Sequence, residues 1–222
     1  MMDHLDFLKR VESHQLTILK DDGIYKHLKF RKPDTSDTYF DLMFFPNHAV
    51  IVGDMGAWSF SRVEDMMRFF RGDSLENIDF GYWKEKVESC SRFGAGNSNS
   101  PFSNFDFETF KESVIEYVDD YFTDSSREES EIDELKEDIN DNVFNQISPY
   151  SGCKGLDFKA YEVLNDYSFD MGDYPNAHIF QFEDIGDIGF TKVTPYFLFA
   201  CFAMRWGIQQ YDKTVDSTII KE

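Results

Sequence analysis

The spacing of hydrophobic residues predicts a helix followed by a small sheet in the first quarter of the chain. Leu5, Leu8 and Leu16 lie at helical intervals, which predicts one helix over residues 3–19. Short aromatic and β-branched runs, separated by turn residues, predict strands after it. These runs cover residues 24–31, 38–45, 49–52 and 58–60. We therefore expect a small antiparallel sheet within residues 24–60.

Helix signals follow the predicted sheet. Ser61 and Glu64 have the spacing of a capping box and predict a helix that ends before Gly72. Residues 78–89 have helical periodicity and are expected to form a second short helix. Residues 94–103 are rich in Gly, Asn, Ser and Pro, a composition typical of a loop or linker.

The helical pattern is strongest in the second half of the chain, where apolar residues recur every three or four positions. The predicted elements are helices over residues 105–122, 128–146, 157–165 and 196–211, and a strand over residues 178–182. The last helix is apolar on most sides, so we expect it to lie at the centre of the core. The elements together predict an α+β fold, with a small antiparallel sheet packed against helices and an acidic helical insertion.

The chain has a net charge of −20 over 222 residues, and the charge is concentrated in one segment. Residues 104–190 contain 23 Asp and Glu residues against five Lys and Arg residues, which accounts for 18 of the 20 net negative charges. We expect an α+β scaffold in residues 1–103, an acidic, mainly helical block in residues 104–190, and a C-terminal helix in residues 191–222 that returns to the scaffold. Such a block attracts basic partners and opposes direct binding to nucleic acid.

Carboxylates recur about every four residues on the two helices of the acidic block. On a helix this spacing gives a row of negative charges along one face, comparable to the phosphates of a nucleic-acid backbone. The candidate partner-binding residues are Glu108, Glu112, Glu116, Asp119, Asp120, Glu128, Glu131, Glu134, Asp138 and Asp141. The alternative is a face that only keeps the chain solvated.

Few other patterns indicate chemistry. Cys90, Cys153 and Cys201 are far apart and belong to no CxxC or Cys/His cluster, so we expect reduced thiols and no metal site. No phosphate-binding loop or dinucleotide fingerprint occurs in the sequence, so no cofactor is expected. The sequence shows no signal peptide, and its longest apolar run is shorter than the roughly 20 residues that span a bilayer. These features predict a cytoplasmic protein without a membrane partner.

One basic cluster interrupts this pattern. It consists of Lys26, Lys29, Arg31 and Lys32, with aromatic residues between them. We interpret it as an exposed strand face whose long side chains keep their charges in water. The alternatives are a patch that binds nucleic acid and a contact with the acidic block of a second subunit.

Two distinctive segments lie toward the two ends of the chain. The first includes Tyr39-Phe40-Asp41-Leu42, Gly53-Asp54-Met55-Gly56-Ala57-Trp58-Ser59-Phe60-Ser61-Arg62 and Phe69-Phe70-Arg71, and the second includes Ala203-Met204-Arg205-Trp206-Gly207-Ile208-Gln209-Gln210-Tyr211-Asp212. Together they resemble a family of uncharacterised proteins encoded by bacteriophages and prophages. The resemblance implies an accessory phage protein that acts in the cytoplasm of a bacterial host. Such proteins often inhibit host defence nucleases, as anti-CRISPR proteins do, and acidic mimicry of nucleic acid is one known route.

We therefore expect a non-enzymatic inhibitor that binds the basic surface of a host nucleic-acid-handling or defence complex through its acidic helices. One alternative is a hydrolase-like enzyme with a pocket near His48, Asp54 and Arg62, because the first distinctive segment is concentrated there. The other is a structural module that forms homo-oligomers through its aromatic surface.

Overall fold

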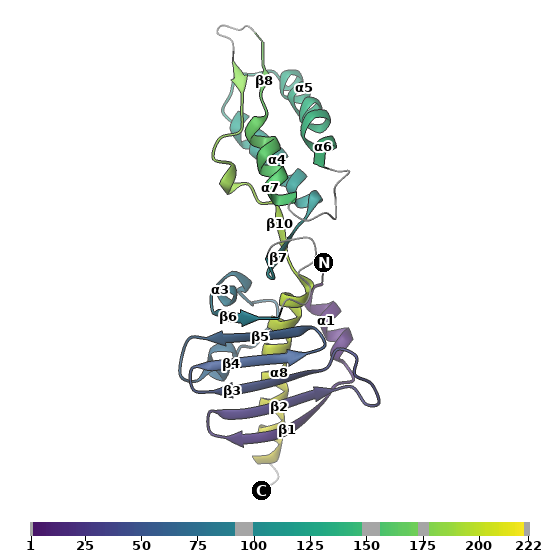
Figure 1. Ribbon diagram of the computed structural model, residues 1–222, viewed down its shortest axis with the longest axis vertical. Helices are drawn as coiled ribbons and strands as arrows, with labels where there is room; N and C mark the ends of the chain where they lie inside the picture. The colour runs from purple at the N-terminus through teal and green to yellow at the C-terminus, as the bar shows by residue number, and fades with distance from the viewer. Residues whose placement is uncertain (1, 92–99, 148–155, 173–177, 220–222) are drawn as a thin grey trace. The chain divides into compact units, whose positions relative to one another are not determined.

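The chain folds into two compact units (Figure 1). The computed structural model describes residues 2–91, 100–147, 156–172 and 178–219. Unit 1 comprises Met1–Gly94 and Val193–Glu222, and unit 2 comprises Ala95–Lys192. An antiparallel sheet in unit 1 and helices in both units confirm the predicted α+β fold.

Unit 1 contains a six-stranded antiparallel sheet in which each strand pairs with the next one along the chain. The strands are β1 (Gln15–Asp22), β2 (Tyr25–Arg31), β3 (Phe40–Phe45), β4 (His48–Gly53), β5 (Gly56–Ser61) and β6 (Val87–Cys90). In β3, Phe40, Leu42 and Phe44 are buried, whereas Asp41 and Met43 between them are half-buried. This alternation with period two directs one face of the sheet into the core.

The first edge strand was not predicted. The helix expected over residues 3–19 is wrong beyond Val11, because α1 spans His4–Val11 and β1 follows it. A ladder with β2, from Gln15 opposite Arg31 to Asp22 opposite Tyr25, gives this segment backbone partners that a helix would not provide. Tertiary pairing therefore overrides the helical spacing of its leucines.

The other edge strand was also predicted as helix. Of residues 78–89, only α3 (Phe80–Lys84) is helical, and β6 pairs with β5 after it. The helix expected from Ser61 begins later, as α2 (Met66–Phe70), and Asp65 caps its first turn. Ser61 instead ends β5, so the capping-box pattern was misleading. Most of the predicted loop over residues 94–103 lies outside the described residues.

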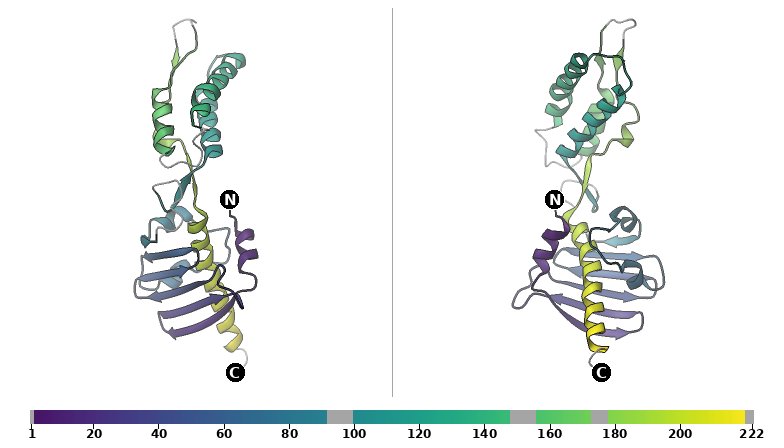
Figure 2. Two further views of the ribbon diagram at one scale, coloured as in Figure 1. Left: turned by 45° about the vertical axis from the view of Figure 1, so that its right-hand side comes forward. Right: turned by 180° about the vertical axis from the view of Figure 1, so that it is seen from behind.

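The helix α8 (Pro195–Ile219) covers the inner face of the sheet (Figure 2). It includes the predicted helix over residues 196–211 and extends beyond it, and its apolar residues from Phe197 to Tyr211 are buried as expected. The helix packs closely on the sheet at Gly207, where an added Cβ would lie 2.6 Å from Leu42 Cδ1 and 3.0 Å from the Phe30 ring. A side chain at this point would force Leu42 and Phe30 to shift.

Replacing Gly207 with Ala is expected to lower the free energy of unfolding of unit 1 by up to about 2 kcal/mol. Overpacking costs about 1–3 kcal/mol, and the better helix propensity of Ala offsets about 1 kcal/mol of that cost. Urea unfolding followed by tryptophan fluorescence measures the change, because all three Trp residues lie in unit 1. Gly81→Ala is the control, since Gly81 is also helical and in unit 1, and its added Cβ would lie no closer than 3.4 Å to Asp79 Oδ1. A stability equal to that of the parent would contradict the close approach.

A buried arginine joins α8 to the segment after α2. Arg205 donates from Nε to the carbonyl of Phe70 (3.1 Å) and from Nη1 to the carbonyl of Ser74 (2.9 Å). Its guanidinium also lies over the ring of Trp83. Burial lowers the pKa of Arg205, but the two carbonyls and the ring satisfy the cation where it lies.

Unit 2 is mainly helical and has its own core. Its elements are β7 (Ser103–Phe105), α4 (Phe107–Phe122), α5 (Glu129–Ile139), the π-helix η1 (Asn140–Phe144), α6 (Asn145–Ile147), α7 (Leu156–Asp166), β8 (Phe169–Asp170), β9 (Ile179–Phe180), the 3₁₀-helix η3 (Ile185–Asp187) and β10 (Thr191–Val193). The helices predicted over residues 105–122 and 157–165 are confirmed within two residues at each end, and the strand over residues 178–182 is shorter than predicted.

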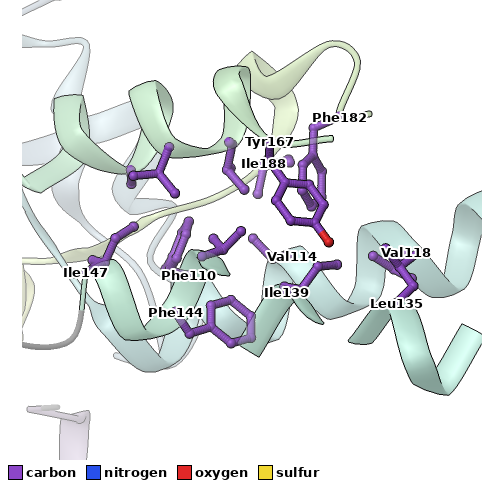
Figure 3. Packing of buried hydrophobic residues seen from close by; sticks show 14 of the residues in the cluster. Phe110, Val114, Val118, Leu135, Ile139, Phe144, Ile147, Tyr167, Phe182 and Ile188 are labelled. Atoms are coloured by element: carbon purple, nitrogen blue, oxygen red, sulfur yellow. The ribbon is translucent and has the colours of Figure 1, made fainter. Parts of the chain in front are cut away.

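Aromatic rings from α4, η1 and the last part of unit 2 meet in this core. Figure 3 shows Phe110 and Val114 of α4 facing Phe144 and Ile139. The ring of Phe110 lies 5.8 Å from that of Phe144 and 5.2 Å from that of Phe190. The helices of unit 2 therefore pack together through aromatic residues on their inner side and have their acidic residues on the outer side.

Candidate partner-binding surface

The start of α4 is fixed by its N-cap residue. The carboxylate of Asp106 accepts hydrogen bonds from the Thr109 amide (2.9 Å) and hydroxyl (2.8 Å), and it forms an ion pair with Lys192 (2.6 Å). Burial raises the pKa of Asp106, but these partners outweigh it and hold the pKa below its ordinary value. An ionised N-cap carboxylate stabilises the first turn and sets the rotation of the helix.

Four carboxylates of α4 lie along one groove. Glu108, Glu112, Glu116 and Asp119 line it from α4, together with Lys111 and Ile115, and Asn140 and Phe144 line it from η1. Because Phe110, Val114 and Val118 are buried in the core, the acids one or two positions away in the sequence lie on another side of the helix and are directed outward. Asp120 is exposed on α4 but does not line this groove.

A second acidic row lies on α5 and η1. Asp133, Glu137 and Asp141 line a neighbouring hollow together with Lys136, and Asn140 lines both hollows. We define the acidic groove surface by nine charged residues of the two hollows. They are Glu108, Glu112, Glu116, Asp119, Asp133, Glu137, Asp141, Lys111 and Lys136. Seven carboxylates and two ammonium groups give this surface a net charge of −5.

The two lysines neutralise only part of the surface. Lys111 pairs with Glu108 (3.1 Å), and Lys136 pairs with Asp119. Across the described segments of the chain, neither Glu112 nor Glu116 forms a salt bridge, although both are exposed. Like charges one turn apart on α4 repel each other. The middle of the groove is therefore negatively charged, although Lys192 attracts Glu112 from outside the groove.

Other predicted acids of α5 have roles within unit 2. Glu128 and Glu131 form the capping box of α5, and Glu131 also pairs with Arg127 (3.5 Å). Asp138 accepts a hydrogen bond from the hydroxyl of Tyr167 (2.8 Å). Burial, together with this hydrogen bond, raises the pKa of Tyr167 far above its ordinary value, so the hydroxyl stays protonated and donates. Glu134 is exposed and lines neither hollow.

A π-helix follows α5 and contributes Asn140 and Asp141 to the hollows. The sequence analysis assumed one α-helix over residues 128–146, but the pattern of hydrogen bonds widens at η1. The side chains of Asn142 and Asn145 donate to the carboxylates of Asp138 and Asp141, respectively, each four positions earlier. The wider turn adds a residue to the helical repeat, and such π segments are frequent at functional sites. Asn140 consequently lies between the two acidic rows.

Asp133 and Glu137 are the groove acids that the sequence analysis missed. With Asp141 they form a row at i, i+4 and i+8, a signal as regular as that of α4. The competing row of Glu131, Glu134 and Asp138 has a similar spacing. Charge periodicity alone does not distinguish the two rows, because acids on both sides of the helix repeat alike.

The residues of the enzyme alternative do not form one pocket. His48 begins β4 and Asp54 follows its last residue, so the rise of a strand separates them by about 20 Å. His48 Nδ1 lies 2.9 Å from the carbonyl of Pro46, and Asp54 accepts from the amide of Thr38 (3.0 Å). Arg62 follows β5, whose last residue pairs with His48. The three side chains therefore lie toward both ends of the hairpin.

The basic cluster of β2 is engaged locally. Lys26 bonds to Asp21 and to the hydroxyl of Tyr211 (3.0 Å). Arg31 pairs with Asp41 (3.4 Å), and Lys32, after the strand, pairs with Asp37 (3.6 Å). These contacts show that neighbouring acids already neutralise these basic groups, which does not favour a surface that binds phosphates.

Two features are absent from the described residues. No helix there is both long and apolar enough to cross a membrane. Nor do those residues include a group of three or more His, Cys, Asp and Glu side chains arranged to hold a metal ion.

Comparison with known proteins gives no match to a protein-family model, a curated protein or a solved structure. The resemblance to phage proteins therefore stays a prediction from the sequence.

Proposed function

We propose that the protein is a phage-encoded accessory inhibitor that binds a basic surface of a host nucleic-acid-handling or defence complex. The acidic groove surface of unit 2 would bind where nucleic acid otherwise binds, and the bacterial cytoplasm would be the place of action. The observation that carries the proposal is the pair of carboxylates without a salt bridge in the described segments, Glu112 and Glu116, within a surface of net charge −5. Clusters of Lys and Arg that neutralise phosphates attract such a surface.

Capture from a bacterial lysate tests the proposal. The immobilised protein is incubated with lysate that has been treated with nuclease, and bound proteins are released first with duplex DNA and then with salt. We expect the captured proteins to be nucleic-acid-binding proteins that DNA releases. Their Kd should rise roughly tenfold or more between about 50 and 500 mM salt, because the attraction is screened. Capture that neither DNA nor salt reverses would contradict mimicry.

The oligomeric alternative has weaker support. Most aromatic rings of unit 1 are buried, so they do not form an adhesive surface. The edge strand β1 exposes Ile18 and Leu19, but its register shifts between Ile18 and Lys20. A bulge of this kind makes an edge a poor template for another strand. Measurement of the molecular mass in solution at low and high salt tests this alternative.

A further inference from the structure

The groove between α4 and η1 has an apolar floor, which charge mimicry alone does not require. Ile115 of α4 and Phe144 of η1 line this floor, and the groove has a volume of about 590 Å³. Ile115 is half-buried and Phe144 is buried, so their accessible atoms face the groove from below. A surface that only imitated phosphates would need the carboxylates but no hydrophobic strip between them.

The dimensions of the groove suit a helix. Its α4 wall extends from Glu108 to Asp119, and the rise of 1.5 Å per residue gives it a length of about 16 Å, or three turns. Amphipathic helices bind in such grooves by placing apolar residues at i, i+3 or i+4, and i+7 on the floor. The residues that flank this stripe then face the rim of the groove.

The rim determines the charge of the occupant. Glu112 and Glu116 lie on either side of Ile115 in the sequence and have no salt bridge within the described part of the chain. A nucleic acid or an acidic peptide would be repelled at this position. Lys and Arg residues next to an apolar anchor would complete the ion pairs that unit 2 leaves open.

We propose that this groove binds an α-helical segment of the partner that presents apolar residues flanked by Lys and Arg. The proposal rests on the proposed function, because it names the chemistry of the partner at the same surface. It adds that one apolar side chain of the partner packs on Ile115 and Phe144. Binding then has a part that salt does not screen, and it discriminates among equally basic partners.

Two synthetic peptides of 18 residues test the groove. Both contain the same numbers of Leu, Lys and Ala residues, but one places Leu along a single helical face and the other has a scrambled order. Fluorescence anisotropy measures the Kd of each peptide for the full-length protein. We expect the amphipathic peptide to bind the parent about tenfold more tightly, because an apolar side chain is buried in the groove.

Variants then locate the difference. Ile115→Gln removes the apolar floor without changing charge, and we expect it to abolish the tenfold preference while leaving the Kd of the scrambled peptide unchanged. Asn140→Trp obstructs the groove at an exposed position outside the core and should have the same effect, which keeps the test valid if Ile115→Gln unfolds. Phe158→Gln is the matched control, because Phe158 is 73% exposed on α7 and does not line the groove.

The outcomes separate the two proposals. If both peptides bind equally, with salt dependence, and no variant changes their binding, the helix-binding groove is overturned. The proposal of an acidic binding surface would then still hold. If neither peptide binds at low salt, the groove is overturned together with the charge attraction on which the proposed function depends. A preference that Ile115→Gln and Phe158→Gln reduce equally would also overturn the groove.

Discussion

A variant with Gln at positions 108, 112 and 116 is expected to lose most of its affinity for the captured partner while remaining folded. The change reduces the net charge of the acidic groove surface from −5 to −2, because three of its seven carboxylates become neutral amides. Charge pairs at an interface contribute about 0.5–1 kcal/mol each where solvent reaches them. Three of them predict a Kd about 10- to 100-fold higher, measured at low salt.

The stability of this variant distinguishes lost binding from lost folding. Neutralisation removes the repulsion among Glu108, Glu112 and Glu116 along α4, but it also removes the ion pair of Glu108 with Lys111, and each effect is worth a few tenths of a kcal/mol. The melting temperature should therefore stay nearly constant. The matched control converts Glu129, Glu162 and Glu183 to Gln, since these are exposed in unit 2 and line neither hollow. If both triple variants bind like the parent, nucleic-acid mimicry by this surface is wrong.

The largest expected loss of stability follows from Phe110→Ala. The Phe110 side chain is fully buried, and the rings of Phe105, Phe144 and Phe190 lie within 6 Å of it. Removing a buried phenyl ring from a core costs about 3–5 kcal/mol through lost transfer energy and the cavity that remains. Such a loss is comparable to the whole stability of a small domain, so unit 2 should unfold at markedly lower temperature.

Two spectroscopic signals separate the units in this experiment. Far-ultraviolet circular dichroism reports on the helices of both units, whereas tryptophan fluorescence reports on unit 1 alone. We expect Phe110→Ala to shift the dichroism transition and leave the fluorescence transition in place, because the core of unit 2 consists of its own residues. Phe158→Ala, at an exposed position, should change neither transition. An equal shift of both signals would show that the two units unfold together.

The sequence predicted the helices of unit 2 better than the strands at the sheet edges. In α4, apolar and acidic residues repeat with one period, so local spacing and tertiary burial agree. In β1, all but one of the residues are exposed, and the leucines that suggested a helix have little contact with the core. An edge strand of this kind forms because its backbone pairs with the neighbouring strand, and the local sequence contains no signal of that pairing.

The candidate surface was predictable only in part for a related reason. The four α4 acids of the groove were identified because α4 is regular along its whole length. On α5, an N-terminal capping box engages Glu128 and Glu131, while Asp138 bonds to a tyrosine about thirty positions later in the chain. Such a long-range partner has no periodic signature. The wider turn of η1 also changes the angle between successive side chains, so a projection drawn for a regular α-helix misplaces the residues after it.

The strand pair β7 and β10 has an evolutionary consequence. The chain enters unit 2 through β7 and leaves it through β10, and these strands are hydrogen-bonded neighbours. Neighbouring strands lie about 5 Å apart, so a short link could rejoin the chain if the whole segment between them were exchanged or deleted. Relatives with a similar sheet and C-terminal helix could therefore carry unrelated inserts at this junction. Changes in the binding surface would then be selected independently of changes in the sheet and α8.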